Sequence, residues 1–333
     1  MRTIKRLMSK YSVKFCLNPL PVLILLFFFC FQILIPNFSH AVSGQRIGTN
    51  GAQFLRLPVN ARAIAMGEAY SAETNGPDSL YWNPAGLGRI ESKSLSLMHA
   101  VYLESIFYDY ASYAQKIRNV GTFGLGVQYL SAGSIEEIDE KETSLGSFNT
   151  YDMAISLGWA KEFGRFLGMK ESEFIVGLTG KFIQSKLTET GITGAADIGI
   201  LWDPIKKNWI SLGVQNLGPS LKFFDAKNEL PLNMSLGYVN HYFESLTLSL
   251  DVNSPRNNNV NVAFGTEYKR AIASDMWLAG RSGFNSRTLA DIKKLSSLSA
   301  GVGFGWKAYA LDFAWVPFGD LGNTYRFSLS AKF

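Results

Sequence analysis

The chain has 333 residues, of which 14% are aromatic, 31 are glycines and only 18% carry a charge. This composition is unusual for a soluble α/β enzyme and favours β structure with an apolar face. The formal net charge of +5 gives no support to a nucleic-acid partner. Residues 1–41 supply five basic residues and no acidic one, and the remainder has 27 Lys and Arg against 27 Asp and Glu.

Residues 1–41 have the pattern of a secretory signal peptide. Basic residues precede an apolar run from Pro19 to Pro36, and Ser39 and Ala41 are small residues at the two positions that a signal peptidase reads. We therefore predict cleavage after Ala41. The alternative is an uncleaved membrane anchor, although the run is slightly short for a span of about 20 residues.

Both cysteines, Cys16 and Cys30, lie in this leader. Lipidation at Cys30 is a third interpretation, but Phe29 stands where a lipidation site requires a small residue. Cleavage would leave a chain without cysteine, which excludes disulfides, thiolate catalysis and cysteine metal sites. No later apolar run reaches about 18 residues, so the pattern predicts no membrane-spanning helix after the leader.

Residues 42–91 do not alternate cleanly in polarity, and they are predicted to hold a short helix. Pro77 suits a first helical turn, Asp78 favours the N-terminal end, and Asn83 with Pro84 stops or kinks the helix. Gly86 is predicted to adopt the left-handed conformation at the helix exit.

From Lys93 to Phe333 apolar and polar residues alternate, as on a pleated strand with one apolar and one polar face. The last strand shows this most clearly, since Tyr325, Phe327 and Leu329 alternate with polar residues. We count fourteen such segments, at 93–102, 105–117, 120–132, 148–163, 172–187, 193–204, 208–217, 232–243, 245–254, 259–271, 276–286, 295–307, 309–317 and 323–333.

A soluble sandwich also alternates, but three observations favour an all-β fold in which residues 92–333 form a transmembrane antiparallel β-barrel. The strand count is even, very short connections alternate with long ones, and apolar faces often end in Trp or Tyr, which suits the two membrane interfaces. The connections at 103–104 and 164–171 fit this alternation poorly. A barrel this wide leaves room for residues 42–91 to fold into the lumen as a plug.

The polar faces of the strands carry single charges among Gly, Ser and Thr, which suits a lumen that holds water or packed side chains. The predicted lumen-facing charged residues are Lys181, Asp251, Glu267, Arg281, Asp312 and Arg326. The chain ends on Phe333 at an outward position. The aromatic pattern of Tyr325, Phe327 and Phe333 resembles the recognition signal of the barrel assembly machinery.

Two long motifs in the predicted plug carry a family resemblance. The run GAQFLRLPVNARAIAMGEAY at 51–70, followed by DSLYWNPAGL at 78–87, is similar to the start of the PorV/PorQ proteins, a branch of the FadL-like outer-membrane transport superfamily. Weaker matches are QNLGP at 215–219 and GTEY at 265–268. The resemblance implies a fourteen-stranded barrel with an N-terminal hatch, exported to the bacterial outer membrane.

The resemblance leaves the role open between two functions. Members that resemble PorV act as outer-membrane components of type IX secretion and receive secreted cargo, which implies secreted proteins or secretion-machinery components as partners. FadL relatives admit hydrophobic small molecules such as fatty acids. A structural barrel without transport is a third interpretation. Outer-membrane lipid is a partner in each case, and none implies a cofactor.

The predicted plug contains several polar and aromatic candidates for a functional site. In one interpretation Arg56, Arg62, Asp78 and Asn83 hold the hatch to lumenal charges such as Glu267, so that release opens a path. In the other they cap helices and satisfy buried backbone groups. The full set of predicted plug residues is Arg56, Arg62, Asp78, Tyr81, Trp82, Asn83, Pro84 and Gly86.

Other chemistry has little support in the sequence. After the leader the chain has only two histidines, His99 and His241, in different strands, so no local nucleophile, base and orienting acid predict an enzyme. The acidic stretch 136–142 is interpreted as a solvated loop or, alternatively, as a Ca²⁺ site. The loop 218–231, with Phe223 and Phe224, either contacts a partner or folds over the barrel mouth.

Overall fold

The computed structural model describes residues 50–101, 106–138, 144–164, 172–223, 226–288, 294–317 and 322–333. All of them belong to one compact unit of the chain, Gly44–Phe333. The predicted leader, its cleavage after Ala41, and Phe224 lie outside the described residues.

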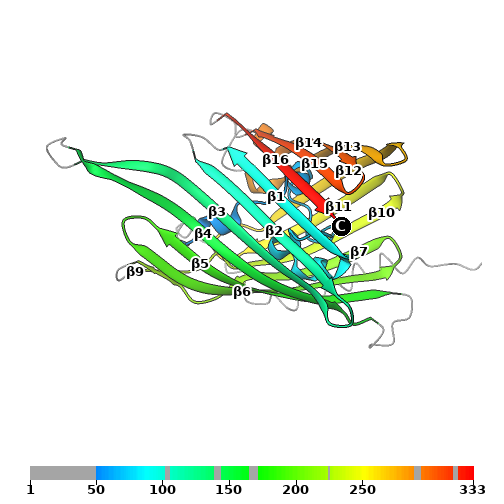
Figure 1. Ribbon diagram of the computed structural model, residues 1–333, viewed down its shortest axis with the longest axis horizontal. Helices are drawn as coiled ribbons and strands as arrows, with labels where there is room; N and C mark the ends of the chain where they lie inside the picture. Colours follow the sequence, from blue (N-terminus) through cyan, green and yellow to red (C-terminus); the bar gives the residue numbers. More distant parts are fainter. Residues whose placement is uncertain are drawn as a thin grey trace, which may run out of the picture. The chain divides into compact units, whose positions relative to one another are not determined.

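Fourteen strands close into a single barrel (Figure 1), and each pairs antiparallel with its neighbours. The first and last strands complete the ring, with Ser94 opposite Lys332 and Val101 opposite Tyr325. The predicted antiparallel barrel is therefore confirmed. Its strands are β1 (Lys93–Val101), β2 (Phe107–Ile117), β3 (Gly121–Ile138), β4 (Ser144–Glu162), β5 (Glu173–Lys186), β6 (Thr190–Ile205), β7 (Asn208–Leu217), β10 (Asn233–Phe243), β11 (Leu246–Pro255), β12 (Asn261–Ala273), β13 (Met276–Asn285), β14 (Leu298–Trp306), β15 (Tyr309–Pro317) and β16 (Asn323–Lys332).

Two predicted connections contain strands. Residues 218–231 include a separate two-stranded sheet of β8 (Leu221–Phe223) and β9 (Ala226–Asn228). β3 and β4 continue into the predicted connection 134–147 as a ribbon that projects beyond the rest of the barrel (Figure 1), with Ser134 opposite Asn149. Alternation did not reveal this ribbon, because two strands that pair only with each other have no face that must be apolar.

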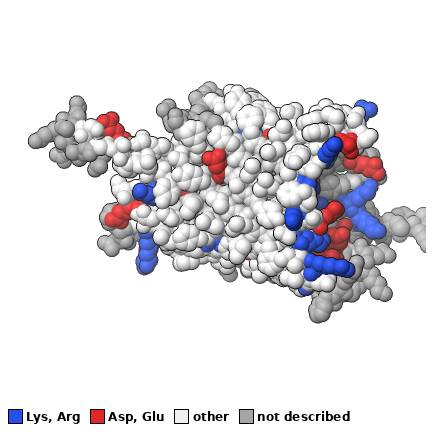
Figure 2. All heavy atoms as spheres, in the orientation of Figure 1, with Lys and Arg blue, Asp and Glu red and all other residues white. Residues whose placement is uncertain are grey.

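The barrel has a short-turn end and a long-loop end. At the short-turn end, where the chain terminates, two-residue turns stand at 206–207, 244–245, 274–275 and 307–308. At the long-loop end the connections include 218–232 and 286–297. The connection 163–172 is long although it lies at the short-turn end, as the sequence indicated. Figure 2 shows the charged side chains gathered toward the two ends, with a largely uncharged band between them.

The period-two pattern of the sequence is realised as two faces of the wall. Along β2, exposed and buried residues alternate from Phe107 to Ser112. Large apolar side chains such as Leu157 and Val302 point outward, with 63% and 60% of their surface exposed. Such side chains on the outside of a closed barrel form the apolar band that lipid covers.

Inside the barrel lies the N-terminal segment, which we define as residues 50–91. Its elements are the 3-10 helices η2 (Gln53–Arg56) and η3 (Pro84–Arg89) and the α-helices α3 (Ala61–Ala65) and α4 (Ser79–Trp82). Most of its residues are buried, including Ile64, Met66 and Leu80. Among the described residues, no helix is long and apolar enough to cross a membrane. The remaining 3-10 helices are η5 (Ser286–Thr288) and η6 (Lys294–Ser297).

The capping and exit residues predicted for the short helix agree only in part with the structure. Asp78 precedes α4 but makes no side-chain cap, whereas the Asn60 side chain caps α3 by accepting a hydrogen bond from the Arg62 backbone N–H at 2.8 Å. The prediction of a left-handed Gly86 is wrong. Gly86 continues the 3-10 helix η3, and a Cβ there would collide with the side chains of Ser79 and Thr74.

Candidate functional site

The N-terminal segment contacts both ends of the lumen. At the long-loop end the backbone N–H of Gly51 donates to the Glu229 carbonyl at 2.9 Å. Toward the short-turn end Glu73 meets His241, with 2.7 Å between Oε2 and Nε2. The segment then packs its second half against β3–β7 before it continues into β1. It therefore fills the lumen along much of its length.

Glycines in the wall admit the backbone of the segment. A Cβ at Gly283 of β13 would overlap the backbone of Gly67, which itself has φ +66°. On the opposite side, a Cβ at Gly177 would overlap Pro84, and one at Gly199 would overlap the Asn83 side chain. Close approach of this kind requires glycine in the strand. The wall sequence is thus adapted to one placement of the segment.

The centre of the site is an ion-pair network around Arg62. Its guanidinium binds Glu267 of β12 through two hydrogen bonds of 2.8 and 2.7 Å, and it donates to Glu73 at 2.6 Å. Arg62 also donates to the Tyr70 hydroxyl at 3.1 Å. Paired, planar hydrogen bonding of arginine to a carboxylate is among the stronger polar contacts in proteins. Arg62 therefore joins two parts of the segment to the wall.

The network continues along the wall. Arg281 of β13 donates from Nε to Glu267 at 2.6 Å and from Nη1 to Asp312 of β15 at 2.7 Å. Both side chains of the Arg281–Glu267 pair are almost fully buried. The predicted lumenal residues Glu267, Arg281 and Asp312 thus lie together, and Arg62 contacts them directly through Glu267.

Glu73 is the second carboxylate held by Arg62. Burial alone would raise its pKa, but Arg62 and His241 outweigh burial and lower the pKa of Glu73 to about 2. Burial also acts on Arg62, yet the adjoining Glu267 and Glu73 hold the pKa of Arg62 above its ordinary value. Both groups are therefore charged in the folded barrel at neutral pH.

A second attachment uses backbone groups of the segment. The Asp251 carboxylate of β11 accepts hydrogen bonds from the backbone N–H groups of Tyr70 and Ser71, at 3.1 and 2.9 Å. The Ser71 hydroxyl lies 2.7 Å from that of Ser211 on β7. A buried carboxylate that accepts two N–H groups fixes the position of the chain between them.

Asp78 and Asn83 contact uncharged groups. Asp78 accepts a hydrogen bond from the Asn60 side chain at 2.8 Å, and burial raises the pKa of Asp78. Asn83 donates to the carbonyls of Ile200 and Leu212, at 3.2 and 3.3 Å. Among Arg56, Arg62, Asp78 and Asn83, the structure thus brings Arg62 to a lumenal charge and leaves Asp78 and Asn83 on neutral partners.

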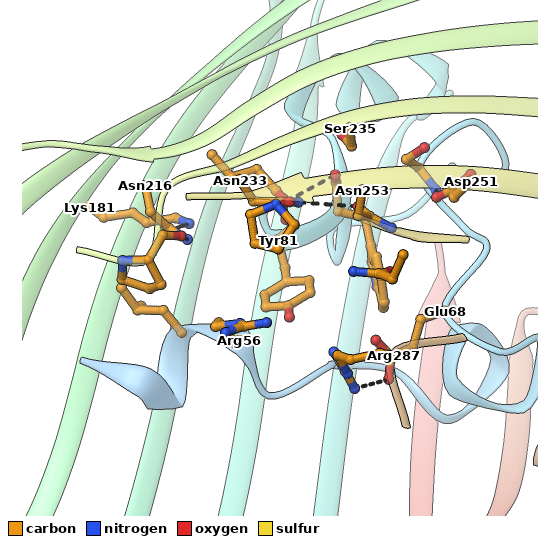
Figure 3. A pocket seen from close by; sticks show the side chains of 17 residues that line it. Arg56, Glu68, Tyr81, Lys181, Asn216, Asn233, Ser235, Asp251, Asn253 and Arg287 are labelled. Atoms are coloured by element: carbon orange, nitrogen blue, oxygen red, sulfur yellow. Dashed lines mark hydrogen bonds and ion pairs between the residues drawn. The ribbon is translucent and has the colours of Figure 1, made fainter. Parts of the chain in front are cut away.

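Arg56 lines a cavity near the long-loop end (Figure 3). Figure 3 shows its side chain beside Tyr81, with Lys181 and Arg287 on either side. Burial, and then Arg287, lower the pKa of Arg56. The cavity has a volume of about 70 Å³, which holds only a few water molecules. Most of its other lining residues are polar, such as Asn216, Asn253 and Asp251.

Lys181 closes an irregularity in the wall next to this cavity. The pairing of β6 with β7 shifts register between Ala196 and Ile198, so that Asp197 faces two residues of β7, Gln215 and Asn216, and β7 carries the extra residue. Lys181 Nζ lies 2.7 Å from Asp197 Oδ2 and donates to Asn216 Oδ1 at 2.8 Å. Both Lys181 and Asp197 are buried. The bulge is therefore filled by an ion pair.

A larger cavity of about 280 Å³ opens on the short-turn side of the Arg62 network. Its lining is strongly polar and charged, and it includes Glu73, His241, Glu267 and Lys269.

Trp82, another predicted plug residue, belongs to the apolar packing of the segment and donates from its indole N–H to the Val59 carbonyl at 3.1 Å.

The connection 218–231 folds inward over the mouth. Leu221 and Leu230 are buried against Phe54 and Leu55 of the segment, and Phe223 is partly buried against the same cluster. Of the two interpretations of this loop, the described residues follow the second, because their apolar side chains have partners within the barrel.

The other predicted site residues have these positions. Arg326 is buried on the inner face of β16. Tyr325, Phe327 and Phe333 point outward with 47%, 56% and 61% of their surface exposed. Of the acidic stretch 136–142, Glu136 lies in β3 and is exposed, while residues 139–142 lie outside the described residues.

Sequence reasoning missed the roles of Glu73, His241 and Asp197. Glu73 lies in a stretch without periodicity, and His241 was considered only as a catalytic candidate. A signal was available for Asp197, because it follows the alternation of β6 and is buried on its inner face, so the two-residue period places it in the lumen. The pairing of Glu73 with His241 across 168 positions was not available from one sequence.

Comparison with known proteins agrees with this architecture. The family model described as type IX secretion system protein PorV matches residues 40–254. The Pseudomonas putida toluene transporter TodX superposes with a TM-score of 0.53 at 11% sequence identity, over 82% of this chain and 96% of that chain. The Ralstonia pickettii toluene transporter TbuX gives 0.50 at 10%, over 83% and 98%. These likenesses to solved structures show a shared fold. No curated protein matches the sequence.

Proposed function

The chain belongs to the PorV family of type IX secretion system proteins, and from that membership we propose that it is a docking component of protein secretion in the outer membrane. In this role the barrel anchors the protein, and its long-loop face receives secreted proteins or other components of the machinery. The proposal assigns no conducting role to the lumen.

The observation that carries this choice is the polar, filled lumen. The N-terminal segment is attached to β12 by the Arg62–Glu267 pair and to β6 and β7 by the Asn83 contacts with Ile200 and Leu212. The two cavities described inside the barrel have volumes of about 70 and 280 Å³ and are lined mainly by polar residues. A hydrophobic small molecule requires an apolar pocket.

The attachments also support a segment that stays in place. Removing one partner from a buried ion pair typically costs about 3–5 kcal/mol, because the other charge is left without compensation. Moving the segment away from the wall would separate Arg62 from Glu267 and Glu73 from His241. A ligand that opened the lumen would have to supply comparable binding energy.

Export and assembly complete the proposal. Residues 1–41 direct the chain across the inner membrane and are removed after Ala41. The outward aromatic residues Tyr325, Phe327 and Phe333 at the C-terminal strand are the contacts for the barrel assembly machinery. The residues 42–91 then serve as the plug of the barrel.

Deletion of the gene tests the proposed function. In the native bacterium, we expect the deletion strain to lose proteins from the cell surface and to take up radiolabelled oleate and toluene at the rate of the parent. Complementation with the wild-type gene should restore the surface proteins. An unchanged surface proteome together with impaired uptake would support the alternative, a FadL-like channel for hydrophobic small molecules.

A further inference from the structure

The outer wall of the barrel is hollowed over its closing strands. A groove of about 720 Å³ lies over β1 and β16 and extends across their neighbours on both sides. Apolar side chains such as Leu97, Val302 and Leu329 line it. Its volume falls in the range of about 300–1,000 Å³ that proteins use for small-molecule ligands. In a membrane such a groove must be filled by apolar groups.

A pair of ionisable residues lies at the edge of this groove. His99 of β1 and Asp109 of β2 are directly opposite each other, with 2.7 Å between Nδ1 and Oδ1. Both side chains are 51% exposed on the lipid-facing side of the wall. Ionisable groups are rare at positions that face lipid and usually indicate a specific role. The lumen network does not involve either residue.

The depth of this pair follows from its neighbours in the wall. Phe327 lies opposite His99, and Tyr129 lies opposite Asp109. Tyr129 stacks on Tyr151, with ring centroids 5.9 Å apart. Rows of outward aromatic residues mark the level where lipid headgroups meet the hydrocarbon. The His99–Asp109 pair is therefore level with the headgroups on the long-loop side.

Polarity changes along the groove in one direction. Two residues closer to the short-turn end than His99 and Asp109, the outward positions are Leu97 and Ala111, which face each other across β1 and β2. Leu329 pairs with Leu97 on the other side. The groove thus offers polar atoms at the headgroup level and an apolar surface beneath, which is the polarity of a lipid molecule in the adjacent leaflet.

We infer that this groove is a specific binding site for one acyl lipid whose headgroup donates hydrogen bonds through hydroxyl or amino groups. Asp109 accepts from the headgroup, and His99 holds the carboxylate in place through Nδ1. The acyl chains lie over Leu97, Ala111 and Leu329. A headgroup with phosphate alone fits less well, because its negative charge would face Asp109.

A lipid fits these observations better than a protein occupant. The wall of a partner barrel would present apolar side chains to the groove and leave the His99–Asp109 pair without a polar contact, at a cost in desolvation. The proposal is independent of the secretion role, since it concerns the outer surface of the wall and not the lumen or the loops.

Native mass spectrometry of the full-length protein, purified in detergent, tests the site. Delipidated protein is incubated with dimyristoyl phosphatidylethanolamine, which has an amino headgroup, or with dimyristoyl phosphatidic acid, which has phosphate alone. We expect one retained molecule of phosphatidylethanolamine per barrel and at least tenfold weaker retention of phosphatidic acid. Equal retention of the two lipids would overturn the assigned headgroup chemistry.

Two variants and a control locate the binding. Ala111→Trp fills the groove, and Asp109→Leu removes the acceptor; each is expected to reduce retention at least tenfold. Ala196→Trp is the matched control, because Ala196 is an outward alanine of β6, five strands round the barrel from β1. Heat-modified migration on gels confirms folding of each. Equal retention by all variants, or a co-purified protein in place of lipid, would overturn the proposal.

Discussion

Arg62 in the N-terminal segment and Glu267 in β12 form a bidentate ion pair, although 205 positions separate them in the chain. Arg62 also binds Glu73 within the segment. Glu267 also binds Arg281 of β13, which in turn binds Asp312 of β15, so this contact connects the segment with three strands of the wall, β12, β13 and β15. The stability of the segment within the barrel should therefore depend on it.

Replacing Arg62 tests that dependence. Arg62→Gln leaves Glu73 and Glu267 buried with fewer compensating charges, so we expect a loss of about 3–5 kcal/mol in the free energy of unfolding. The measurement is urea unfolding of the detergent-solubilised barrel, followed by tryptophan fluorescence. Arg270→Gln is the control, because Arg270 is an exposed residue of the same strand, β12. A loss no larger than that of the control would argue against a structural role for the pair.

A pair of glycines in β13 tests the fit between wall and segment. A Cβ at Gly283 would overlap the backbone of Gly67, whereas a Cβ at Gly280 meets open space. We expect Gly283→Ala to destabilise the barrel by about 1–3 kcal/mol through overpacking, and Gly280→Ala to have little effect. Urea unfolding in detergent compares the two variants. Equal stabilities would mean that the segment does not press on β13.

The lowered pKa of Glu73 predicts that the stability of the barrel depends on pH. Its pKa is lowered from 4.5 to about 2 in the folded state, so its charged form contributes about 3 kcal/mol of stability above the unfolded pKa. This contribution is lost as the pH falls from about 5 toward 2. We therefore expect Glu73→Gln to be less stable than the wild type at pH 7. The difference should shrink steadily as urea unfolding is repeated at lower pH, and a constant difference would contradict the assignment.

The barrel was predictable because each wall strand carries its own evidence. Tyr325, Phe327 and Leu329 alternate with polar residues in the sequence and point outward in the structure. A two-residue period depends only on neighbours along the chain, since one face meets lipid and the other the lumen. The inward positions of Glu267 and Arg281 followed from the same alternation.

The contacts of the segment were not predictable in the same way. Nothing near Asn83 in sequence indicates that its side chain reaches the carbonyls of Ile200 and Leu212. Gly86 was expected at a helix end because glycine is common there, but it lies within η3, where Ser79 and Thr74 leave no room for a Cβ. In both cases tertiary packing decided what local preference alone could not.

The buried pair of Lys181 and Asp197 separates the effect of charge from that of packing. Lys181→Met leaves the Asp197 carboxylate inside the wall without its cation, and we expect a loss of about 3–5 kcal/mol. Lys181→Met combined with Asp197→Leu replaces both charges by apolar groups, so the double variant should be more stable than Lys181→Met alone. Urea unfolding of Lys181→Met, Asp197→Leu and the double variant in detergent gives the coupling energy. If the losses of the two single variants simply add in the double variant, the ion pair does not stabilise the wall at the β7 bulge.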